Sequence, residues 1–421
     1  NEYVVHSRNP CHSDLHVGDY RVHYATSGEA VTILEFDSKS YRPSTLIDLY
    51  DACRLVDKLD YIHQFGQTVI PTEISDLDEH DFNVAYALVS GTEKPFEMTF
   101  NRAKNIKGAL EMFDIVLGGE GRFSKKPFCT FGGCPIVSPL RFAKENLDVL
   151  VETSRLGLIN DIAIAPQAGA TAPVTLAGTL AQVTAEGLAC LAVVNFIRSG
   201  CPMSFAIWPF ISDLRTGSFS GGSGEEALIV AAAVQIGKFY DLPTTVPSCM
   251  TDSKIPDAQA GYEKGISAIL AGLAGGNRIL ESAGMLGSLM GCSFEALVID
   301  NEMLGSIQRV IRGIEVTEET LSVKEIKEVA LGEGHYLGHK QTLEHMQSEF
   351  LYPKLADRTP LGEWEENGSK DIFDRAHETV CKILSSHYPN HISSKIDKEI
   401  RDKFPILLSL NSMKPNERWV C

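Results

Sequence analysis

Residues 161–210 read DIAIAPQAGATAPVTLAGTLAQVTAEGLACLAVVNFIRSGCPMSFAIWPF, which is a short apolar run, a long helical pattern and a second apolar run. Within it, Thr171 suits a helix cap, Pro173 suits the first turn and Gly200 suits the stop. A strand, a helix and two turns need about 30 residues or more. The stretch is therefore one strand–helix unit followed by the strand of the next unit.

The same unit repeats along the chain. Its candidate strands are 61–71, 94–100, 126–135, 161–170, 201–210, 242–252, 277–286 and, weakest, 334–339. Eight strand–helix units predict an α/β fold of the (β/α)8 TIM barrel type. An open, doubly wound sheet is the alternative, but it normally has a glycine-rich phosphate turn after an early strand, and the sequence has none.

The barrel is expected over 46–351, between two smaller regions. Residues 1–45 contain the β-forming run VTILEFD (31–37) and predict a small N-terminal β appendage. Residues 352–421 are polar and helical in pattern, and predict a C-terminal helical extension. Because the chain begins with Asn and its first residues read as strand, we expect that an N-terminal segment is missing.

Composition narrows the class of protein. The chain has 38 Lys and Arg against 55 Asp and Glu, a net charge of −17, which argues against binding to nucleic acid or to an anionic membrane. The ten cysteines form no CxxC pair, which indicates reduced thiols in a cytoplasmic protein. No apolar run of 18 residues is present, so we expect no membrane span. Homo-oligomerisation is left open.

Polar residues gather where the predicted strands end, and in this fold the active site lies at that end. The polar stretch TDSKIPDAQAGYEKG (251–265) directly follows the apolar strand 242–252 and is therefore expected at the barrel mouth. The predicted catalytic residues are Asp213, Asp252 and His335. The predicted substrate-binding residues are Gln167, Trp208, Phe210, Arg215, Thr251 and Tyr336.

Structural roles remain open for several of these residues. Asp213 and Arg215 can pair to brace a loop, and the 251–265 stretch can cap a helix through Asp257. His335 and His339 have the i, i+4 spacing of metal ligands, but the glycines beside them argue against a helix, so we expect no metal. The aromatic residues Trp208, Phe210 and Tyr336 either pack around a loop or hold a quaternary ammonium ion by cation–π attraction.

Several segments together resemble the trimethylamine–corrinoid methyltransferase family, from about residue 15 to 385. They are APQAGATAPVTLAGTLAQ (165–182), SDLRTG (212–217), TDSKIPDAQAGYEK (251–264), SFEALVIDNEML (293–304), RGIEV (312–316) and GEGHYLGH (332–339). The resemblance implies a (β/α)8 barrel that transfers a methyl group from a methylated amine to Co(I) of a corrinoid. It also implies that a corrinoid-binding partner protein carries this cofactor.

The founding trimethylamine enzymes of this family use pyrrolysine in the region that corresponds to ESAGMLGSLMGCSFE (281–295), where this chain has standard residues only. The chain is therefore similar to the non-pyrrolysine branch, whose members demethylate quaternary amines such as glycine betaine. A quaternary ammonium leaves as a neutral tertiary amine, so holding it in line with a strong nucleophile is enough. Positioning of this kind supplies about 7–11 kcal/mol in favourable cases.

The sequence thus predicts methyl transfer from a quaternary amine, with glycine betaine as the first choice. Two alternatives stay open. One is a zinc-dependent or other TIM-barrel methyltransferase acting on a different methylated compound, which needs a His/Cys ligand set that the sequence does not show convincingly. The other is a non-catalytic binding protein on the same scaffold.

Overall fold

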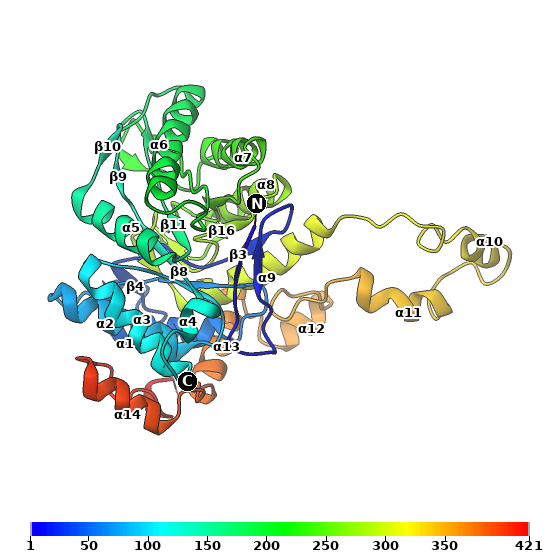
Figure 1. The fold of residues 1–421 in the computed structure, drawn as a ribbon. Coiled ribbons are helices and arrows are strands. Elements are labelled where there is room, and N and C mark those ends of the chain that lie inside the picture. Colours follow the sequence, from blue (N-terminus) through cyan, green and yellow to red (C-terminus); the bar gives the residue numbers. More distant parts are fainter. Residues whose placement is uncertain (1, 420–421) are drawn as a thin grey trace.

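The computed structural model describes residues 2–419 (Figure 1). Within them, the strand pairings join eight parallel strands into a closed ring. The strands are β3 (His23–Tyr24), β6 (Phe65–Gly66), β7 (Phe96–Thr99), β8 (Cys129–Gly133), β11 (Asn160–Ile162), the extended segment 203–207, β15 (Thr245–Pro247) and β16 (Arg278–Leu280). Each pairs with the next, and β16 pairs with β3 to complete the circle. The predicted (β/α)8 barrel is confirmed.

A helix follows each barrel strand on the outside of the ring. These helices are α1 (Leu46–Val56), α2 (Leu77–Gly91), α3 (Ile106–Val116), α5 (Lys144–Leu156), α6 (Leu176–Ile197), α7 (Gly224–Phe239), α8 (Ala258–Leu273) and α9 (Phe294–Arg312). Side-chain caps begin several of them. Ser223 accepts from the backbone N–H of Glu226 at α7, and Ser293 accepts from that of Ala296 at α9.

Small β-elements extend the ring beyond the carboxyl ends of its strands, which we call the barrel mouth. β4 (Thr32–Leu34) and β5 (Tyr41–Pro43) form one sheet with β17 (Met285–Leu286) and β18 (Gly291–Cys292). β12 (Gln167–Ala168) pairs with β13 (Phe210–Asp213), which pairs with β14 (Ser218–Phe219). A hairpin of β9 (Ile136–Val137) and β10 (Arg141–Phe142) follows β8. The loops around the mouth are therefore tied to one another by strand pairing.

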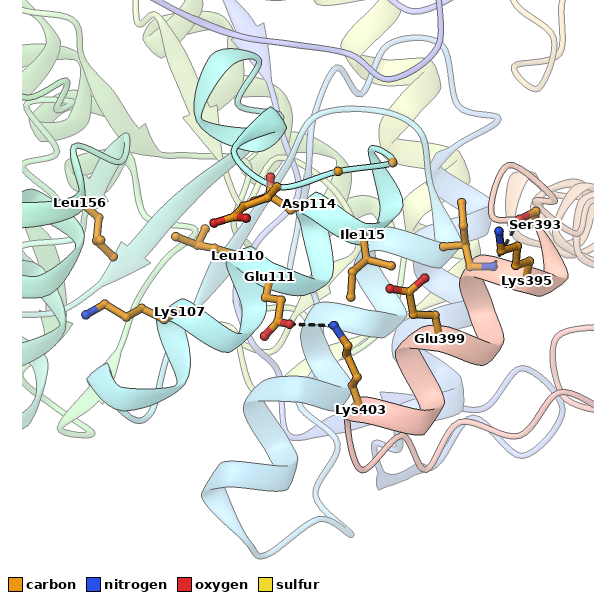
Figure 2. Close-up of a pocket in the computed structure, with 14 residues that line it drawn as sticks. Lys107, Leu110, Glu111, Asp114, Ile115, Leu156, Ser393, Lys395, Glu399 and Lys403 are labelled. Atoms are coloured by element: carbon orange, nitrogen blue, oxygen red, sulfur yellow. Dashed lines mark hydrogen bonds and ion pairs between the residues drawn. The ribbon is translucent and has the colours of Figure 1, made fainter.

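The C-terminal region covers one half of the helical ring. Helix α13 (Ile372–Ser386) packs on α9 and α1, and α14 (Ser394–Lys403) packs on α3, with α12 (Leu361–Glu366) nearby in sequence. Figure 2 shows the hollow of about 1020 Å³ between α3 and α14, where Lys403 donates to Glu111 over 2.9 Å. Three short helical elements are also present, namely α4 (Arg122–Lys125), η1 (Ala103–Asn105) and η2 (Glu417–Trp419).

Two further helices, α10 (Val323–Leu331) and α11 (Lys340–Glu349), lie outside this compact body. With the chain on either side of them, they form an arm that projects away from the barrel (Figure 1). The arm leaves after α9 and returns beside it, where Arg309 donates to the backbone oxygen of Glu349 over 2.8 Å.

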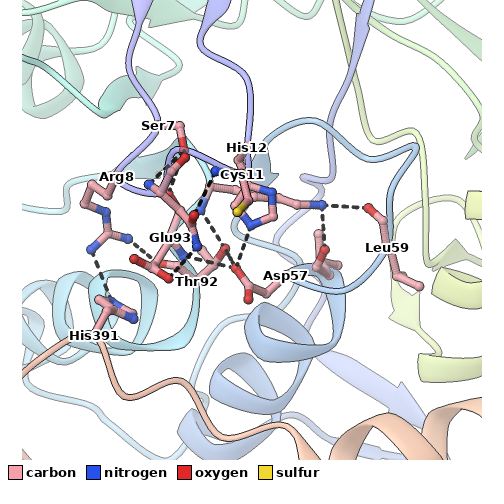
Figure 3. A network of polar contacts seen from close by, with 12 residues as sticks. Ser7, Arg8, Cys11, His12, Asp57, Leu59, Thr92, Glu93 and His391 are labelled. Atoms are coloured by element: carbon pink, nitrogen blue, oxygen red, sulfur yellow. Dashed lines mark hydrogen bonds and ion pairs between the residues drawn. The ribbon is translucent and has the colours of Figure 1, made fainter.

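The N-terminal hairpin closes the opposite end of the barrel. β1 (Tyr3–Val5) pairs antiparallel with β2 (Leu15–Val17), and Tyr3 hydrogen-bonds Ser204 over 2.5 Å. Figure 3 shows the polar network at the turn of this hairpin, where Nε2 of His12 lies 3.7 Å from Oδ1 of Asp57. Asp57 accepts from Thr92 over 2.6 Å and contacts His387 at 2.9 Å. Burial alone would raise its pKa, but these hydrogen bonds hold the pKa of Asp57 below its usual range.

Two predictions about the strands were wrong. The expected eighth strand at 334–339 lies on the arm as turn and loop, because Gly334 and Gly338 have φ values of +75° and +81°. Its place in the ring belongs to β3, so the expected appendage 1–45 contributes a barrel strand as well as the β1–β2 hairpin. A strand of two residues has no periodicity to detect, and its extended form is set by the strands on both sides.

A buried lysine holds the chain entering the barrel at the end away from the mouth. The Nζ of Lys94 donates to the backbone oxygens of Val56, Leu59 and Ile62 over 2.8, 2.6 and 2.7 Å. Burial lowers the pKa of Lys94 to about 8. One side chain thus satisfies three carbonyls between α1 and β6.

Replacing Lys94 by Met should lower the free energy of unfolding by about 3 kcal/mol or more, because three buried carbonyls lose their donor. The measurement is urea denaturation of the Lys94→Met variant, with Lys58→Met as the control because Lys58 is exposed. Equal stability of the two variants would contradict this role for Lys94.

Candidate active site

Three carboxylates face one another inside the barrel mouth. Glu97 lies on β7, Glu281 directly follows β16, and Glu29 follows β3. The hydroxyl of Thr99 donates to Glu29 over 2.6 Å, and Arg278 donates to Glu97 over 2.7 Å. Burial, and then the charges of Glu97 and Glu29, raise the pKa of Glu281 to about 8. The three groups therefore form one cluster, in which three carboxyl groups share a single guanidinium.

The backbone of β8 lies close to the side chains of this cluster at Gly132. A Cβ on Gly132 of β8 would lie 3.0 Å from Oε1 of Glu97 and 3.1 Å from Cγ2 of Thr99, so a larger residue would displace them. Glu281 has a φ of +61°, which is uncommon for a residue with a side chain. Strain of this type persists only where surrounding structure enforces it, and it is typical of functional sites.

Two buried side chains, Glu281 of the cluster and Gln67, have polar atoms without a hydrogen-bond partner. Among the described residues, Oε2 of Glu281 accepts no hydrogen bond, and neither polar atom of the Gln67 amide makes one. Gln67 follows β6 at the same end of the barrel. An unpaired buried polar group lowers stability, so these atoms are available to hydrogen-bond a ligand.

A fourth carboxylate extends the acidic region toward the loops. Glu226 lies in the first turn of α7 and is buried. Burial, and then the charge of Glu281, raise the pKa of Glu226 well above its usual range. Four acidic side chains thus come from four different strand–helix units, and a bound cation would relieve the repulsion among them.

Aromatic residues lie at the same end of the barrel as the carboxylates. Trp208 and Phe210 lie in one buried apolar cluster with Leu280, the residue before Glu281. Their ring centroids are 6.3 Å apart, and the indole N–H of Trp208 donates to the backbone oxygen of Thr245 over 3.2 Å. The same cluster contains small interior residues, namely Ala25, Ala163, Ala165 and Ala206. Aromatic rings beside carboxylates are the environment that favours an organic cation.

The polar stretch after β15 connects the loops of the mouth. Asp252 accepts from the hydroxyl of Ser220 over 2.7 Å, from the N–H of Gly221 over 2.9 Å and from the hydroxyl of Ser288 over 2.6 Å. Thr251 is buried and donates to Glu263 over 2.5 Å. Asp257 caps α8, as the structural alternative proposed. These polar residues therefore hold three neighbouring loops in place.

Other predicted residues lie at the outer edge of the mouth. Arg215 donates to Asp213 from Nε over 3.0 Å and from Nη2 over 2.7 Å, which is the pairing considered as an alternative. These hydrogen bonds lower the pKa of Asp213 to about 2. Gln167 accepts from Ser212 over 3.0 Å. A hollow of about 410 Å³ at this edge is lined by residues that include Ser212, Asp213 and Arg215.

Two predicted residues lie elsewhere. His335 and Tyr336 are exposed between α10 and α11, on the arm that projects from the barrel. Their assignment to the mouth depended on an eighth strand at 334–339, and the structure has no strand there. The structure therefore groups Gln167, Trp208, Phe210, Asp213, Arg215, Thr251 and Asp252 at one end of the barrel and separates His335 and Tyr336 from them.

Comparison with known proteins assigns the family. A profile described as "Trimethylamine methyltransferase (MTTB)" matches residues 1–404. The chain belongs to the trimethylamine methyltransferase family. A "Trimethylamine methyltransferase MttB" of Desulfitobacterium hafniense (strain DSM 10664 / DCB-2) is 31% identical over 398 residues, 94% of this chain and 79% of that protein. A "Trimethylamine methyltransferase MttB" of Methanosarcina thermophila is 31% identical over 402 residues, 95% of this chain and 82% of that protein.

A "Glycine betaine methyltransferase" of Desulfitobacterium hafniense (strain Y51) is 30% identical over 401 residues, 95% of this chain and 82% of that protein. Among solved structures, a dihydropteroate synthase from Coxiella burnetii in complex with pteroic acid has a TM-score of 0.44 and 12% identity, over 73% of this chain and 99% of that one. This structural likeness is distant, and the barrel is established by its strand pairing. The resemblance to the family is confirmed, and the chain is a methyltransferase.

Sequence reasoning about this methyltransferase missed the carboxylate cluster. Glu29 lies in the region expected to be an appendage, and Glu97 lies within the strand run KPFEMTF (94–100). A carboxylate within a short apolar strand is itself a signal, because an interior strand position requires a partner for its charge. Within residues 2–419, no group of three or more His, Cys, Asp or Glu is arranged to hold a metal ion.

Replacing Asp252 by Asn should loosen the mouth of the methyltransferase. The carboxylate of Asp252 has two acceptor oxygens for the hydrogen bonds from Ser220, Gly221 and Ser288, whereas the amide of Asn has one. We expect faster hydrogen exchange in residues 213–223 and 284–290 and slower methyl transfer. Asp37→Asn, an exposed position between β4 and β5, is the control. Exchange rates in both loops equal to those of the wild type would show that Asp252 does not hold them.

The raised pKa of Glu281 has a consequence for stability. The folded chain keeps a proton on Glu281 up to about pH 8, whereas the unfolded chain releases it near the ordinary glutamate pKa, so stability should fall as pH rises from 5 to 8. The contribution of one group is at most about 1.4 kcal/mol per pH unit. Urea denaturation at pH 5, 6.5 and 8 should show a smaller decline for Glu281→Gln than for Glu145→Gln, an exposed control. Identical declines in the two variants would show that Glu281 does not cause the loss of stability with rising pH.

Proposed function

We propose that this methyltransferase transfers a methyl group from a quaternary amine to Co(I) of a corrinoid, with glycine betaine as the first-choice substrate. The observation that carries the proposal is the cluster of Glu29, Glu97 and Glu281 at the end of the barrel where Trp208 also lies. A permanent cation satisfies both features, because it balances the acidic charge and is attracted to the face of the aromatic ring.

The chemistry of the amine favours a quaternary substrate. When the C–N bond of a quaternary ammonium breaks, nitrogen keeps the electron pair and leaves as a neutral tertiary amine. No proton has to be delivered, so the protein only has to bind the cation, exclude water and orient one methyl carbon. The standard residues at 281–295 agree with this reading, as does the similarity to a glycine betaine methyltransferase at 30% identity.

Each end of a betaine has candidate partners at the mouth. Trp208 and Phe210 would contact the methyl groups, and Glu281 would become ionised when the ammonium binds beside it. The unpartnered amide of Gln67 offers a donor for the substrate carboxylate, and Arg215 at the outer edge offers a cation. Gln167 would border the substrate, while Thr251 and Asp252 position the loops. Asp213 would orient Arg215.

The corrinoid would arrive on a partner protein, and the rim of the mouth suits such a contact. Exposed apolar side chains lie on the loops that follow four of the strands, namely Val137, Leu140, Phe142, Leu214, Ile255 and Met290. The cobalt(I) would supply the electron pair that forms the new bond to the methyl carbon. Exposed hydrophobic groups around an opening are typical of protein docking sites. We place the reaction in the cytoplasm, where buried thiols such as Cys53, Cys129 and Cys249 would stay reduced. The expectation that every cysteine is a reduced thiol was wrong, because Cys381 is disulfide-bonded.

The proposal is tested by methyl transfer to free cob(I)alamin, followed by absorbance, with glycine betaine, proline betaine, carnitine and trimethylamine as donors. We expect turnover with a betaine and little with trimethylamine. Trp208→Leu should raise KM for the betaine by about 2–30-fold, the range of a cation–π contact. Trp364→Leu on α12 is the control. Ready turnover of trimethylamine and none of any betaine would show that the substrate class is wrong.

A further inference from the structure

The arm has almost no core of its own. Among the described residues 313–349, Val329 is the one buried residue. Large apolar side chains are instead open to solvent, with Ile314 at 89% exposure and Leu331 and Leu337 at 81%. Isolated helices shorter than about 12–15 residues are marginal in water, and a segment of this size cannot bury enough apolar surface alone. The arm therefore requires a second surface to be stable.

The outer face of α6, α7 and α8 is apolar and almost uncharged. Within the described residues of these helices, Glu186, Glu226, Glu263 and Lys264 are buried, which leaves only Glu225 and the half-buried Lys238 on the outside. Phe196 is 92% exposed and Phe239 is 82% exposed. Helix α6 is apolar and long enough to cross a membrane by length and composition alone. In a chain of net charge −17, such a face indicates a contact surface.

This face belongs to the half of the ring that no other described element covers. Helix α13 lies on α9 and α1, and α14 lies on α3, whereas α6, α7 and α8 stand free at the top of Figure 1. A hollow of about 550 Å³ runs between α6 and α7. Its lining is small and apolar on the α6 side, with Ala177, Leu180 and Ala181, and includes Ala232, Ile236 and Phe239 on the α7 side.

Helix α10 has the pattern that fits such a groove. Val323, Ile326 and Ala330 are spaced i, i+3 and i+7, so they share one helical face, while Glu328 lies on the opposite side. An amphipathic helix that places such a face in an apolar groove is a recurring mode of protein recognition. The chain thus carries both halves of a complementary contact, and the arm points away from its own groove (Figure 1).

We propose that α10 of one chain packs into the α6–α7 groove of a second copy of the same chain. Two copies repel each other because each carries a charge of −17, and the α6–α8 face has almost none of that charge. If both arms exchange, the contact closes as a two-fold dimer. A stable interface takes about 20–30 residues from each partner, and the arm together with this face supplies them.

The first test is the mass of the chain in solution, by light scattering after size exclusion. The wild type should be a dimer or a larger assembly of dimers. Ile326→Asp on the arm and Ala181→Glu in the groove should each give monomers, with the melting of the barrel unchanged by circular dichroism. Glu328→Lys on the opposite face of α10 should leave the assembly intact. A monomeric wild type, or assemblies that survive both substitutions, would overturn the proposal.

The second test mixes the two variants. Ile326→Asp keeps an intact groove and Ala181→Glu keeps an intact arm, so the mixture retains one arm–groove contact and should form a mixed dimer that neither variant forms alone. A face-to-face dimer of α6 would not be restored by mixing, and that result would overturn the arm contact. Flotation of a monomeric wild type with phosphatidylcholine vesicles would instead assign the uncharged face to a membrane surface.

Discussion

The guanidinium of Arg278 lies inside the closed barrel, fully buried, and its partners come from other strands of the ring. It donates to Gln64 over 2.8 Å and to Glu97 over 2.7 Å, and it pairs with Asp161 of β11. A charge at this depth is tolerated only with such partners. If β16 slipped by one residue, Arg278 would turn to the outer face and leave two carboxylates buried without a cation. The register of the barrel therefore depends on this contact.

The same contact leaves the mouth acidic. One guanidinium serves both Glu97 and Asp161, and Glu29, Glu226 and Glu281 have no cation among their described hydrogen-bond and ion-pair partners. Their raised pKa values show that folding gathers carboxyl groups where charge is unfavourable. Such an arrangement lowers the stability of the free protein and favours any ligand that brings positive charge.

Sequence patterns predicted the long elements and missed the short ones. The 161–210 stretch gave the right order of strand, helix and strand, because α6 has 22 residues of apolar pattern. The first barrel strand went unrecognised, because β3 has two residues and its pairing partner β16 lies far along the chain. Trp208 and Asp252 were predicted at the barrel mouth from their places after strands, and they lie there. Glu29 and Glu281 were not, because their proximity arises only when β3 and β16 meet.

The pairing of β3 with β16 also determines when the barrel can close during synthesis of the chain. His23 opposes Arg278, so the ring closes across 255 residues of sequence. A ribosome adds about 5–20 residues per second, so the first strand waits many seconds before its second neighbour exists. During that time the growing sheet has two open edges, each able to pair with another nascent chain. We therefore expect expression of this protein to be sensitive to synthesis rate and to chaperones that shield strand edges.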